Sequence, residues 1–229
     1  MKIFAIADLH FDFKKEKPMN VFGDNWINHE EKIIENWKIN VSDNDLVLVP
    51  GDISWAVKLE DAMGDLQRIE DLPGTKIIGK GNHDYWWATS NKLDNLKLQT
   101  IKFLKNNSYE LDETVICGTR GWDTMEEHTE EESNKKIFLR ELNRLKISLD
   151  SAKKSKKPII AMLHYPPFNS DGLPNEFFSL LKEYEVDTCL YGHLHGEDGH
   201  KNIKEGFIDN ITVHCVSSDY MDFKLKRIK

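Results

Sequence analysis

The sequence predicts an α/β fold in one domain that spans residues 1–229. Short β-rich runs alternate with helical patterns along the whole chain, and this alternation is typical of layered α/β proteins. Hydrophobic residues make up 39% of the sequence and are spread over it in short runs, which is enough to build a sizeable core. No break in composition marks a linker between two domains. We therefore expect a single folded unit.

The first half of the chain carries four strand patterns separated by helix patterns. The predicted strands are Ile3–Ala7, Leu46–Val49, Lys76–Ile78 and Ile101–Leu104, and the predicted helices are Asn28–Asn40, Leu59–Asp71 and Thr89–Lys97. The second half repeats this rhythm. Its predicted strands are Val115–Cys117, Ile159–Leu163, Thr188–Tyr191, Ile211–Val216 and Phe223–Ile228, and a helix is predicted over Glu176–Tyr184.

The longest predicted element is an amphipathic helix over Glu131–Lys154. Its apolar residues recur at spacings of three and four, and they are Phe138, Leu142, Leu145, Leu149 and Ala152. The opposite face is charged, so we expect it to be solvated. The acidic run Glu126–Glu132 leads into this helix, and acidic residues stabilise a helix N-terminus. We interpret the run as a helix start or a loop rather than as a cation site.

The charge of the chain bears on its partners. There are 39 acidic and 31 basic residues, giving a formal charge of −8, so the average field repels a polyanion and disfavours nucleic acid. The N-terminal apolar run is too short for a signal peptide, and no apolar run reaches the roughly 18 residues that cross a bilayer. We expect a cytoplasmic protein with no membrane partner, and the oligomeric state stays open.

The three cysteines, Cys117, Cys189 and Cys215, lie in apolar, strand-like stretches without the pair spacing of a metal site. An odd number of cysteines cannot all pair within one chain. We expect buried free thiols, as in a reducing compartment.

Five short segments share one feature: an apolar, strand-like run ends in Asp, Asn or His. They are Ile6-Ala7-Asp8-Leu9-His10, Val49-Pro50-Gly51-Asp52, Gly79-Lys80-Gly81-Asn82-His83-Asp84, Met162-Leu163-His164 and Tyr191-Gly192-His193-Leu194-His195. In α/β sheets the strand ends are where loops converge and ligands bind. Each segment alone is more often structural than catalytic. Together they would place many buried charges at separate strand ends, which metal ions can satisfy jointly.

Spacing within two of the segments supports a metal site. Residues i and i+2 of an extended segment point the same way, so Asp8 with His10, and His193 with His195, can each address a common point. Imidazole beside carboxylate, without thiolate, suits divalent Mn, Fe, Co, Ni or Zn, and it disfavours Ca²⁺ as the only metal. Availability decides among these metals, and we expect Mn²⁺ to support activity best.

The ordered set Asp-x-His, Gly-Asp, Gly-Asn-His-Asp, His and Gly-His-x-His, which runs from residue 8 to residue 195, resembles the calcineurin-like metallophosphoesterase superfamily. The resemblance implies a four-layer α/β/β/α sandwich with two mixed sheets and a dinuclear metal site at the C-terminal ends of the strands. The alternating pattern is compatible with that architecture but does not by itself choose two sheets over one. The match of all five motifs in order is far more specific than any one of them.

Carried over residue by residue, the resemblance assigns the metal ligands. It places Asp8, His10 and His195 on one metal, Asn82, His164 and His193 on the other, and Asp52 as the bridge. It also places His83 beside the phosphoryl group, as a donor to its oxygens or to the leaving group. Asp84 would then orient His83 and raise its pKa. The alternative for His83 is a packing or capping role.

Further residues in the same loops are candidates for contacts with substrate. Trp55, Tyr85 and Tyr165 can stack on a base or an aryl group, or can instead pack and stiffen the ligand loops. Arg120 follows another predicted strand and can bind phosphate through its guanidinium fork, or can form a surface ion pair. Both readings stay open for each residue.

The expected function is hydrolysis of a small phosphomonoester or phosphodiester. The resemblance implies that a water held between two metal ions loses a proton and that the resulting hydroxide attacks phosphorus. One alternative is a nuclease with the same site, which would need a basic groove that the sequence does not reveal. The other is an interaction module that has lost turnover, although no ligand type is missing here.

Overall fold

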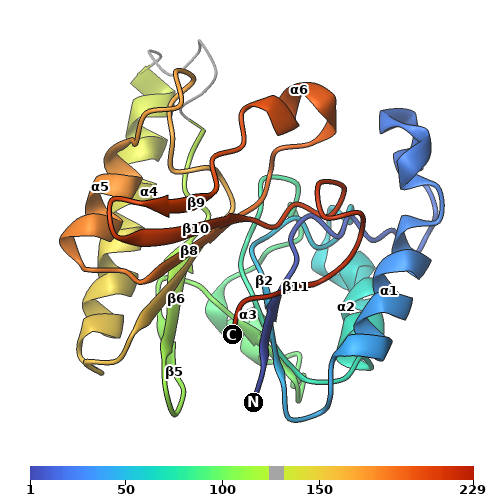
Figure 1. Ribbon diagram of the computed structural model, residues 1–229. Helices are drawn as coiled ribbons and strands as arrows, with labels where there is room; N and C mark the ends of the chain where they lie inside the picture. Colours follow the sequence, from blue (N-terminus) through green and yellow to red (C-terminus); the bar gives the residue numbers. More distant parts are fainter. Residues whose placement is uncertain (124–131) are drawn as a thin grey trace.

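The computed structural model describes residues 1–123 and 132–229 and arranges them in four layers, helices, sheet, sheet and helices (Figure 1). The predicted four-layer α/β/β/α sandwich with two mixed sheets is confirmed. Residues 126–131 of the predicted acidic run lie outside the described residues. Within the described ranges, no helix has the length and apolarity needed to cross a bilayer.

The first sheet is built mainly from the N-terminal half of the chain. Its strand order is β11-β1-β2-β3-β4, with β1 Ile3–Ala5, β2 Leu46–Val49, β3 Thr75–Ile78 and β4 Ile101–Phe103 parallel, and β11 Lys226–Arg227 antiparallel to β1. The helices that pack on its outer face are α1 His29–Asn40, α2 Leu59–Glu70 and α3 Ser90–Asp94. Two short 3₁₀ helices, Met19–Phe22 and Asp24–Trp26, precede α1.

The second sheet takes up the rest of the chain. Its strand order is β5-β6-β7-β8-β10-β9, with β6 Val115–Thr119, β7 Ile159–Leu163, β8 Thr188–Tyr191 and β10 Ile211–Cys215 parallel, and β5 Ser108–Glu110 and β9 Gly206–Ile208 antiparallel at the edges. The helices α4 Glu132–Lys153 and α5 Glu176–Glu183 cover its outer face, and a short helix, α6 Gly196–Lys201, follows β8. The sequence patterns do not predict β5, β9 or α6.

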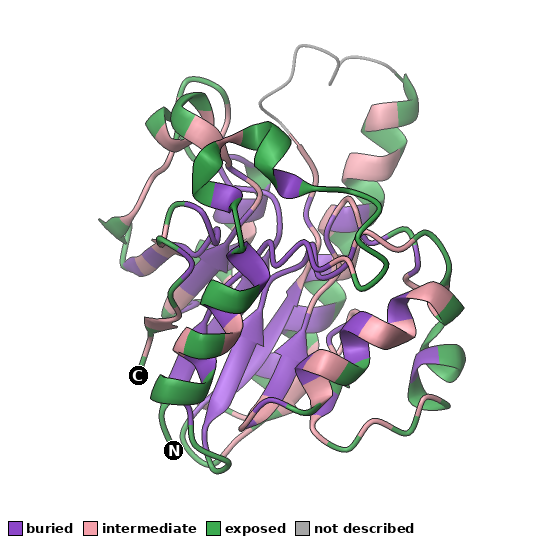
Figure 2. Cartoon of the chain, turned by 90° about the vertical axis from the view of Figure 1, so that its right-hand side faces the viewer, coloured by how far each residue is buried: buried purple, intermediate pink, exposed green. Residues whose placement is uncertain are grey.

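Alternate residues along each strand serve two different cores. In β1, Ile3 and Ala5 face the second sheet, whereas Phe4 faces the helices of the first layer. In β7, Ile160 faces the first sheet and Ile159 faces α4 and α5. Because both faces of each sheet are covered, the central strands are buried along their length (Figure 2). This explains why they appear in the sequence as continuous apolar runs.

Several predicted elements lose one or two residues at their ends, and two are shorter by four residues. The helix predicted to reach Lys97 ends at Asp94, and Lys97 itself has φ 54°, outside helical conformation. The last strand predicted from Phe223 pairs only at Lys226–Arg227. Phe223 has φ 56°, which no strand accommodates, and its buried ring packs 5.1 Å from that of Trp26. Tertiary packing therefore overrides local β propensity at this end of the chain.

The three cysteines are free and buried, as predicted.

Candidate metal centre

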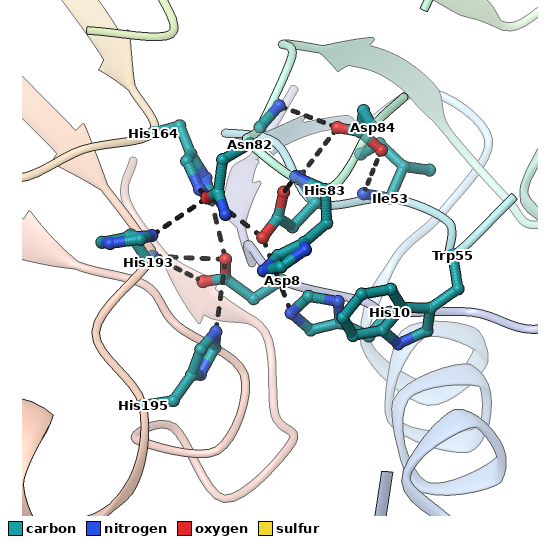
Figure 3. Close-up of polar contacts among 12 residues, drawn as sticks. Asp8, His10, Ile53, Trp55, Asn82, His83, Asp84, His164, His193 and His195 are labelled. Carbon is teal, nitrogen blue, oxygen red and sulfur yellow. Dashed lines mark hydrogen bonds and ion pairs between the residues drawn. The ribbon is translucent and has the colours of Figure 1, made fainter. Parts of the chain in front are cut away.

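The seven predicted ligands converge at the carboxyl-terminal ends of five strands; Figure 3 labels six of them, and the seventh, Asp52, lies 3.7 Å from His10 and 3.5 Å from His164. Asp8 and His10 follow β1, Asp52 follows β2, Asn82 follows β3, His164 follows β7, and His193 and His195 follow β8. The first three of these strands belong to one sheet and the other two to its partner, so the cluster lies where the two sheets meet. We call these seven residues the ligand cluster.

The backbone that carries the ligand cluster is held in an unusual conformation. Asp8, His10, Asp52 and His193 have φ values of 61°, 46°, 53° and 75°, in the left-handed region that L-residues other than glycine seldom adopt. Such residues cost free energy unless the surrounding structure enforces them, and they concentrate at functional sites. All four lie in the loops that follow β1, β2 and β8, within five residues of the strand end.

Two glycines allow the loops to approach one another closely. A Cβ added to Gly81 would lie 2.0 Å from Oδ1 of Asp52, and one added to Gly192 would lie 2.5 Å from Oδ2 of Asp8. Both distances are below any real contact. The Gly-Asn and Gly-His sequences therefore serve the site by leaving room for the carboxylates of neighbouring loops.

The side-chain atoms of the cluster are close enough to share cations. Asp8, His10 and His195 each offer a ligand atom within 4.8 Å of the others, and so do Asp8, Asp52 and His164. The carboxylates are almost fully buried, with Asp8 at 0% and Asp52 at 1% exposure. Asp8 belongs to both groups. Each group also contains a histidine that follows a strand of the second sheet, so ligands from both sheets lie together.

Asn82 extends the cluster toward the second sheet. Its Oδ1 lies 2.6 Å from Nε2 of His164 and 3.1 Å from Nδ1 of His193. The other ring nitrogen of His164 lies 3.1 Å from the carbonyl of Pro50, so a proton on Nδ1 would leave the lone pair of Nε2 facing the cluster. One amide oxygen and two imidazoles thus meet at a single point.

The cluster contains buried polar atoms that no group of the described residues satisfies. Nδ1 of His10, Oδ2 of Asp52 and Nε2 of His195 have no hydrogen-bond partner. Burial, and then the carboxylates of Asp84 and Asp8, raise the pKa of Asp52 well above its ordinary value. Leaving such groups unpaired costs several kcal/mol, roughly 1–3 for each neutral group and more for a charge. Carboxylate, amide and imidazole donors with free lone pairs fit divalent cations.

The histidines of the cluster differ in how readily they take a proton. Burial lowers the pKa of His164 and that of His193 to about 3 in each case, so their lone pairs stay available for ligation. Burial also opposes the charged form of His195, but the carboxylates of Asp8 and Asp219 outweigh it and raise its pKa to about 10. A cation bound at His195 would therefore have to displace a proton.

Asp219 is a residue of the site that the sequence motifs do not reveal. Its Oδ1 accepts a hydrogen bond from Nδ1 of His195 at 2.8 Å, and its Oδ2 accepts one from the backbone N–H of Gly196 at 2.8 Å. This arrangement turns Nε2 of His195 toward Asp8, 3.6 Å away. Carboxylates that hold a ligating histidine in this way are common in metal sites. Its position in the sequence could have revealed it, because Ser217-Ser218-Asp219 follows β10 and makes this a sixth strand that is followed by polar residues.

The predicted relation between Asp84 and His83 is wrong. The carboxylate of Asp84 accepts hydrogen bonds from the indole of Trp86 and from four backbone N–H groups, those of Gly81, Asp52, Ile53 and Ser54. With its oxygens engaged in this way, Asp84 ties the second ligand loop to the third. Burial, followed by the charge of nearby His195, lowers the pKa of His83 instead of raising it.

His83 itself lies at the mouth of the cluster. Its backbone N–H donates to Oδ1 of Asp52 at 2.8 Å, and its half-buried ring lies 4.5 Å from the ring of Trp55 and 5.6 Å from that of His10. The side chain thus faces the space in front of the ligands from the loop after β3 (Figure 3).

The predicted aromatic contacts occupy three different positions. Trp55 stacks on His10 with ring centroids 4.8 Å apart, and Tyr165 is buried with its ring 4.4 Å from that of His193. Both geometries match the alternative in which aromatic residues stiffen the ligand loops. Tyr85 is 61% exposed, with its ring 6.4 Å from that of His83, and it remains open to contact from solvent.

Arg120 stands apart from the ligands. Its backbone carbonyl accepts hydrogen bonds from the N–H groups of His164 and Tyr165, each at 3.0 Å, but its guanidinium contacts Glu141 and the ring of Trp122. Its side chain is only 15% exposed, so it is not a simple surface ion pair.

Comparison with known proteins identifies the same family that the sequence motifs resemble. The family model described as calcineurin-like phosphoesterase matches residues 1–197. No curated protein matches the chain. Among solved structures, the crystal structure of a protein of unknown function, AQ665 from Aquifex aeolicus, covers 99% of this chain and 95% of its own with 14% identity and a TM-score of 0.51. That likeness concerns the fold alone.

Proposed function

The chain belongs to the calcineurin-like phosphoesterase family, and from this membership we propose that it hydrolyses a small phosphomonoester or phosphodiester with two divalent cations. The observation that carries the proposal is that two buried ligand atoms, Oδ2 of Asp52 and Nε2 of His195, have no hydrogen-bond partner among the described residues. Oδ2 of Asp52 lies 3.5 Å from Nε2 of His164, and Nε2 of His195 lies 3.6 Å from Oδ1 of Asp8, so both atoms face the ligand cluster. A structural role would have paired them.

The proposed ligands fall into two sets with one bridge. Asp8, His10 and His195 hold one cation, since their ligand atoms lie within 4.8 Å of one another. Asn82, His164 and His193 hold the other, supported by the contacts of the Asn82 amide oxygen with both rings. Asp52 bridges the two: its Oδ2 lies 3.7 Å from Nε2 of His10 and 3.5 Å from Nε2 of His164.

Two cations in such a site supply an activated water and neutralise the charge of the phosphoryl oxygens. The protein's own residues position the reactants. His83, at the mouth of the cluster, donates a hydrogen bond to a phosphoryl oxygen or to the leaving oxygen. Its lowered pKa favours the neutral ring near pH 7, and a neutral imidazole still carries one N–H to donate. Asp84 acts through the backbone of the ligand loops, as a positioning residue.

The donor set is compatible with several metals. Nitrogen and oxygen ligands without thiolate suit Mn, Fe, Co, Ni or Zn. We propose Mn²⁺ as the ion that supports activity best, because one carboxylate bridge and one neutral amide among oxygen and nitrogen donors suit a hard to borderline cation.

The first experiment measures manganese-dependent hydrolysis of p-nitrophenyl phosphate and bis-p-nitrophenyl phosphate, with the Asp52→Asn variant as the blank. Turnover of either ester that the variant loses supports the proposal and reveals the preference for monoesters or diesters. Metal content is measured on the same samples. A protein that binds two metal ions yet turns over no phosphate ester in a broad panel would contradict the proposal.

A further inference from the structure

A second feature of the same edge is a cavity of about 460 Å³ whose lining includes several basic residues and one acidic residue, Glu141. It lies where the carboxyl ends of β3, β4 and β6 meet α4, next to the strands that carry the ligand cluster. The cationic residues that line it are Lys80, Lys92, Lys105, Arg120, Arg140 and Arg144. We call these six residues and the space between them the basic cavity. Its charge is opposite to the net charge of −8 on the chain.

A single buried carboxylate organises the arginines of the basic cavity. Glu141 has a side chain only 2% exposed, and its Oε1 lies 2.6 Å from Nη1 of Arg144, 3.6 Å from Nη2 of Arg120 and 3.7 Å from Nε of Arg140. Its Oε2 accepts a hydrogen bond from Thr119 at 3.1 Å. Among the residues that the structure describes, this one negative charge lies beside three guanidinium groups and can neutralise only one of them. The remaining positive charge favours the binding of another anion.

An unpartnered donor of Arg120 also indicates a missing anion. Nε of Arg120 is buried and has no hydrogen-bond partner, so this guanidinium keeps a donor for an acceptor that the described residues do not supply. Guanidinium groups that are held close together in this way can bind an anion through charged hydrogen bonds.

Short connections join the basic cavity to the ligand cluster. The guanidinium of Arg120 lies 4.7 Å from the ring of Trp122, which packs 5.9 Å from Tyr165, and Tyr165 packs 4.4 Å from His193. Lys80, on the other flank, lies two residues before Asn82. The basic cavity therefore lies close to the ligand cluster.

We propose that the basic cavity binds a second anionic group of the substrate, whose scissile phosphate lies at the ligand cluster. The substrate is then a small phosphate ester with a second phosphate or a carboxylate on its leaving group. The inference rests on the proposed function and narrows its substrate class. A volume of about 460 Å³ lies in the range of small-molecule pockets and cannot enclose an extended polynucleotide.

The test varies the distance between the two phosphates of the substrate, because only one range of distances would let one phosphate lie at the ligand cluster and the other in the basic cavity. The manganese-loaded protein is assayed for phosphate release from the bisphosphates of linear diols with two to six carbons. Each is compared with the monophosphate of the same diol, after a twofold correction for its two equal scissile groups. We expect kcat/KM for the best bisphosphate to exceed that of its monophosphate by about 10–100-fold, the worth of one or two charged hydrogen bonds.

A pair of variants on α4 locates the effect. Arg144→Gln removes a cavity cation, and it should reduce the bisphosphate preference by about tenfold, mainly through KM. Lys146→Gln removes one positive charge from the same helix two residues away, where the lysine pairs with Asp150 instead. The control should keep the preference of the wild-type protein. A loss of preference in both variants would show a general charge effect and overturn the inference.

Binding to the metal-free protein gives a measurement that does not depend on turnover. Inorganic pyrophosphate is titrated calorimetrically into wild-type protein, Arg144→Gln and Lys146→Gln after chelation of metals. We expect binding by the wild type and the control, weakened about tenfold in Arg144→Gln.

The outcomes separate the two proposals. Ester turnover without any preference for bisphosphates, or pyrophosphate binding that Arg144→Gln leaves unchanged, overturns the inference and leaves the proposed function standing. Pyrophosphate binding without turnover of any ester overturns the proposed function, and with it the assignment of the anion to a substrate. Preferential cleavage of a single-stranded oligonucleotide over every bisphosphate overturns the inference in favour of a nuclease.

Discussion

The ligand cluster and the basic cavity lie on the same edge of the protein and are opposite in charge. The cluster gathers carboxylates and imidazoles, and its one strongly basic group is His195, with a pKa of about 10. The cavity is lined by six cations, three of them arginines beside Glu141. Both contain buried nitrogen or oxygen atoms without partners, such as Oδ2 of Asp52 and Nε of Arg120. Each region is therefore built for a partner of the other sign.

The two regions also differ in how their side chains are held. The cluster is carried on strand ends with left-handed backbone, and its short side chains are fixed by hydrogen bonds between loops. The cavity is lined by long lysine and arginine side chains from loops and α4, such as Arg140, which is 55% exposed. Ligation and catalysis need short side chains in a fixed geometry, and the long side chains of the cavity reach an anion from several elements. We infer that the cluster sets the reaction and the cavity sets the choice of substrate.

The largest expected effect comes from removing the bridging charge of the cluster. Asp52→Asn should lose both cations and lower kcat by roughly 10⁴-fold or more, because a neutral amide cannot bridge two cations. Metal content and turnover are measured together. Asp45→Asn is the control, since this buried aspartate caps Lys2 and Ser42 away from the cluster. If the Asp52→Asn variant keeps both metal ions, Asp52 is not the bridge, and the ligand cluster does not depend on this charge as proposed.

The next effect separates ligation from catalysis within the cluster. His83→Ala should keep its metal and lower kcat by about 10²–10⁴-fold, because the ring faces the open side of the site without a place in the proposed ligand set. Elemental analysis of the purified variant checks the first part and steady-state kinetics the second. If the variant is purified without metal, His83 is a ligand and the assignment fails.

A smaller effect is expected from Asp219, which does not belong to the ligand cluster but accepts a hydrogen bond from the ligand His195. Asp219→Asn should weaken metal binding by about 10–100-fold, because His195 loses the charge that orients it. Competition with a metal-sensitive dye measures the affinity. A matched change is Asp198→Asn on α6, where Asp198 pairs only with Lys201 among the described residues. Equal losses in the two variants would contradict a specific role for Asp219.

The smallest effect per step is a pH dependence of metal binding, which amounts to about tenfold for each pH unit. His195 has a pKa raised to about 10, so the metal-free protein holds this proton at neutral pH and must release it to bind a cation at Nε2. Affinity should therefore rise with pH, by about tenfold per unit for one proton, between pH 6 and 8. His164 and His193, with pKa values of about 3, add nothing in this range.

Calorimetry in buffers of different ionisation enthalpy counts the protons released. Asp219→Asn should reduce the slope, since it removes part of the charge that holds the proton. An affinity independent of pH would show that His195 is already neutral in the metal-free protein.

Local signals in the sequence determined much of this protein. Apolar runs buried on both faces predict the central strands, and polar residues directly after them predict the place of the ligands. Helix patterns predict α1, α2, α4 and α5 to within a residue or two of their ends. These features depend on neighbours along the chain, so the sequence contains them directly.

Tertiary structure decided what depends on residues far apart in the chain. The stacking of two sheets brings Asp8 to His195. The strand order of the second sheet brings Asp219 behind His195, and the packing of α4 on that sheet brings Arg144 to Arg120 around Glu141. It assigned Asp84 to backbone N–H groups of two loops rather than to His83. The sequence shows that a residue is Asp or Glu but does not show which partner its carboxylate contacts. Its role is set by packing, because burial and distance fix which charges interact.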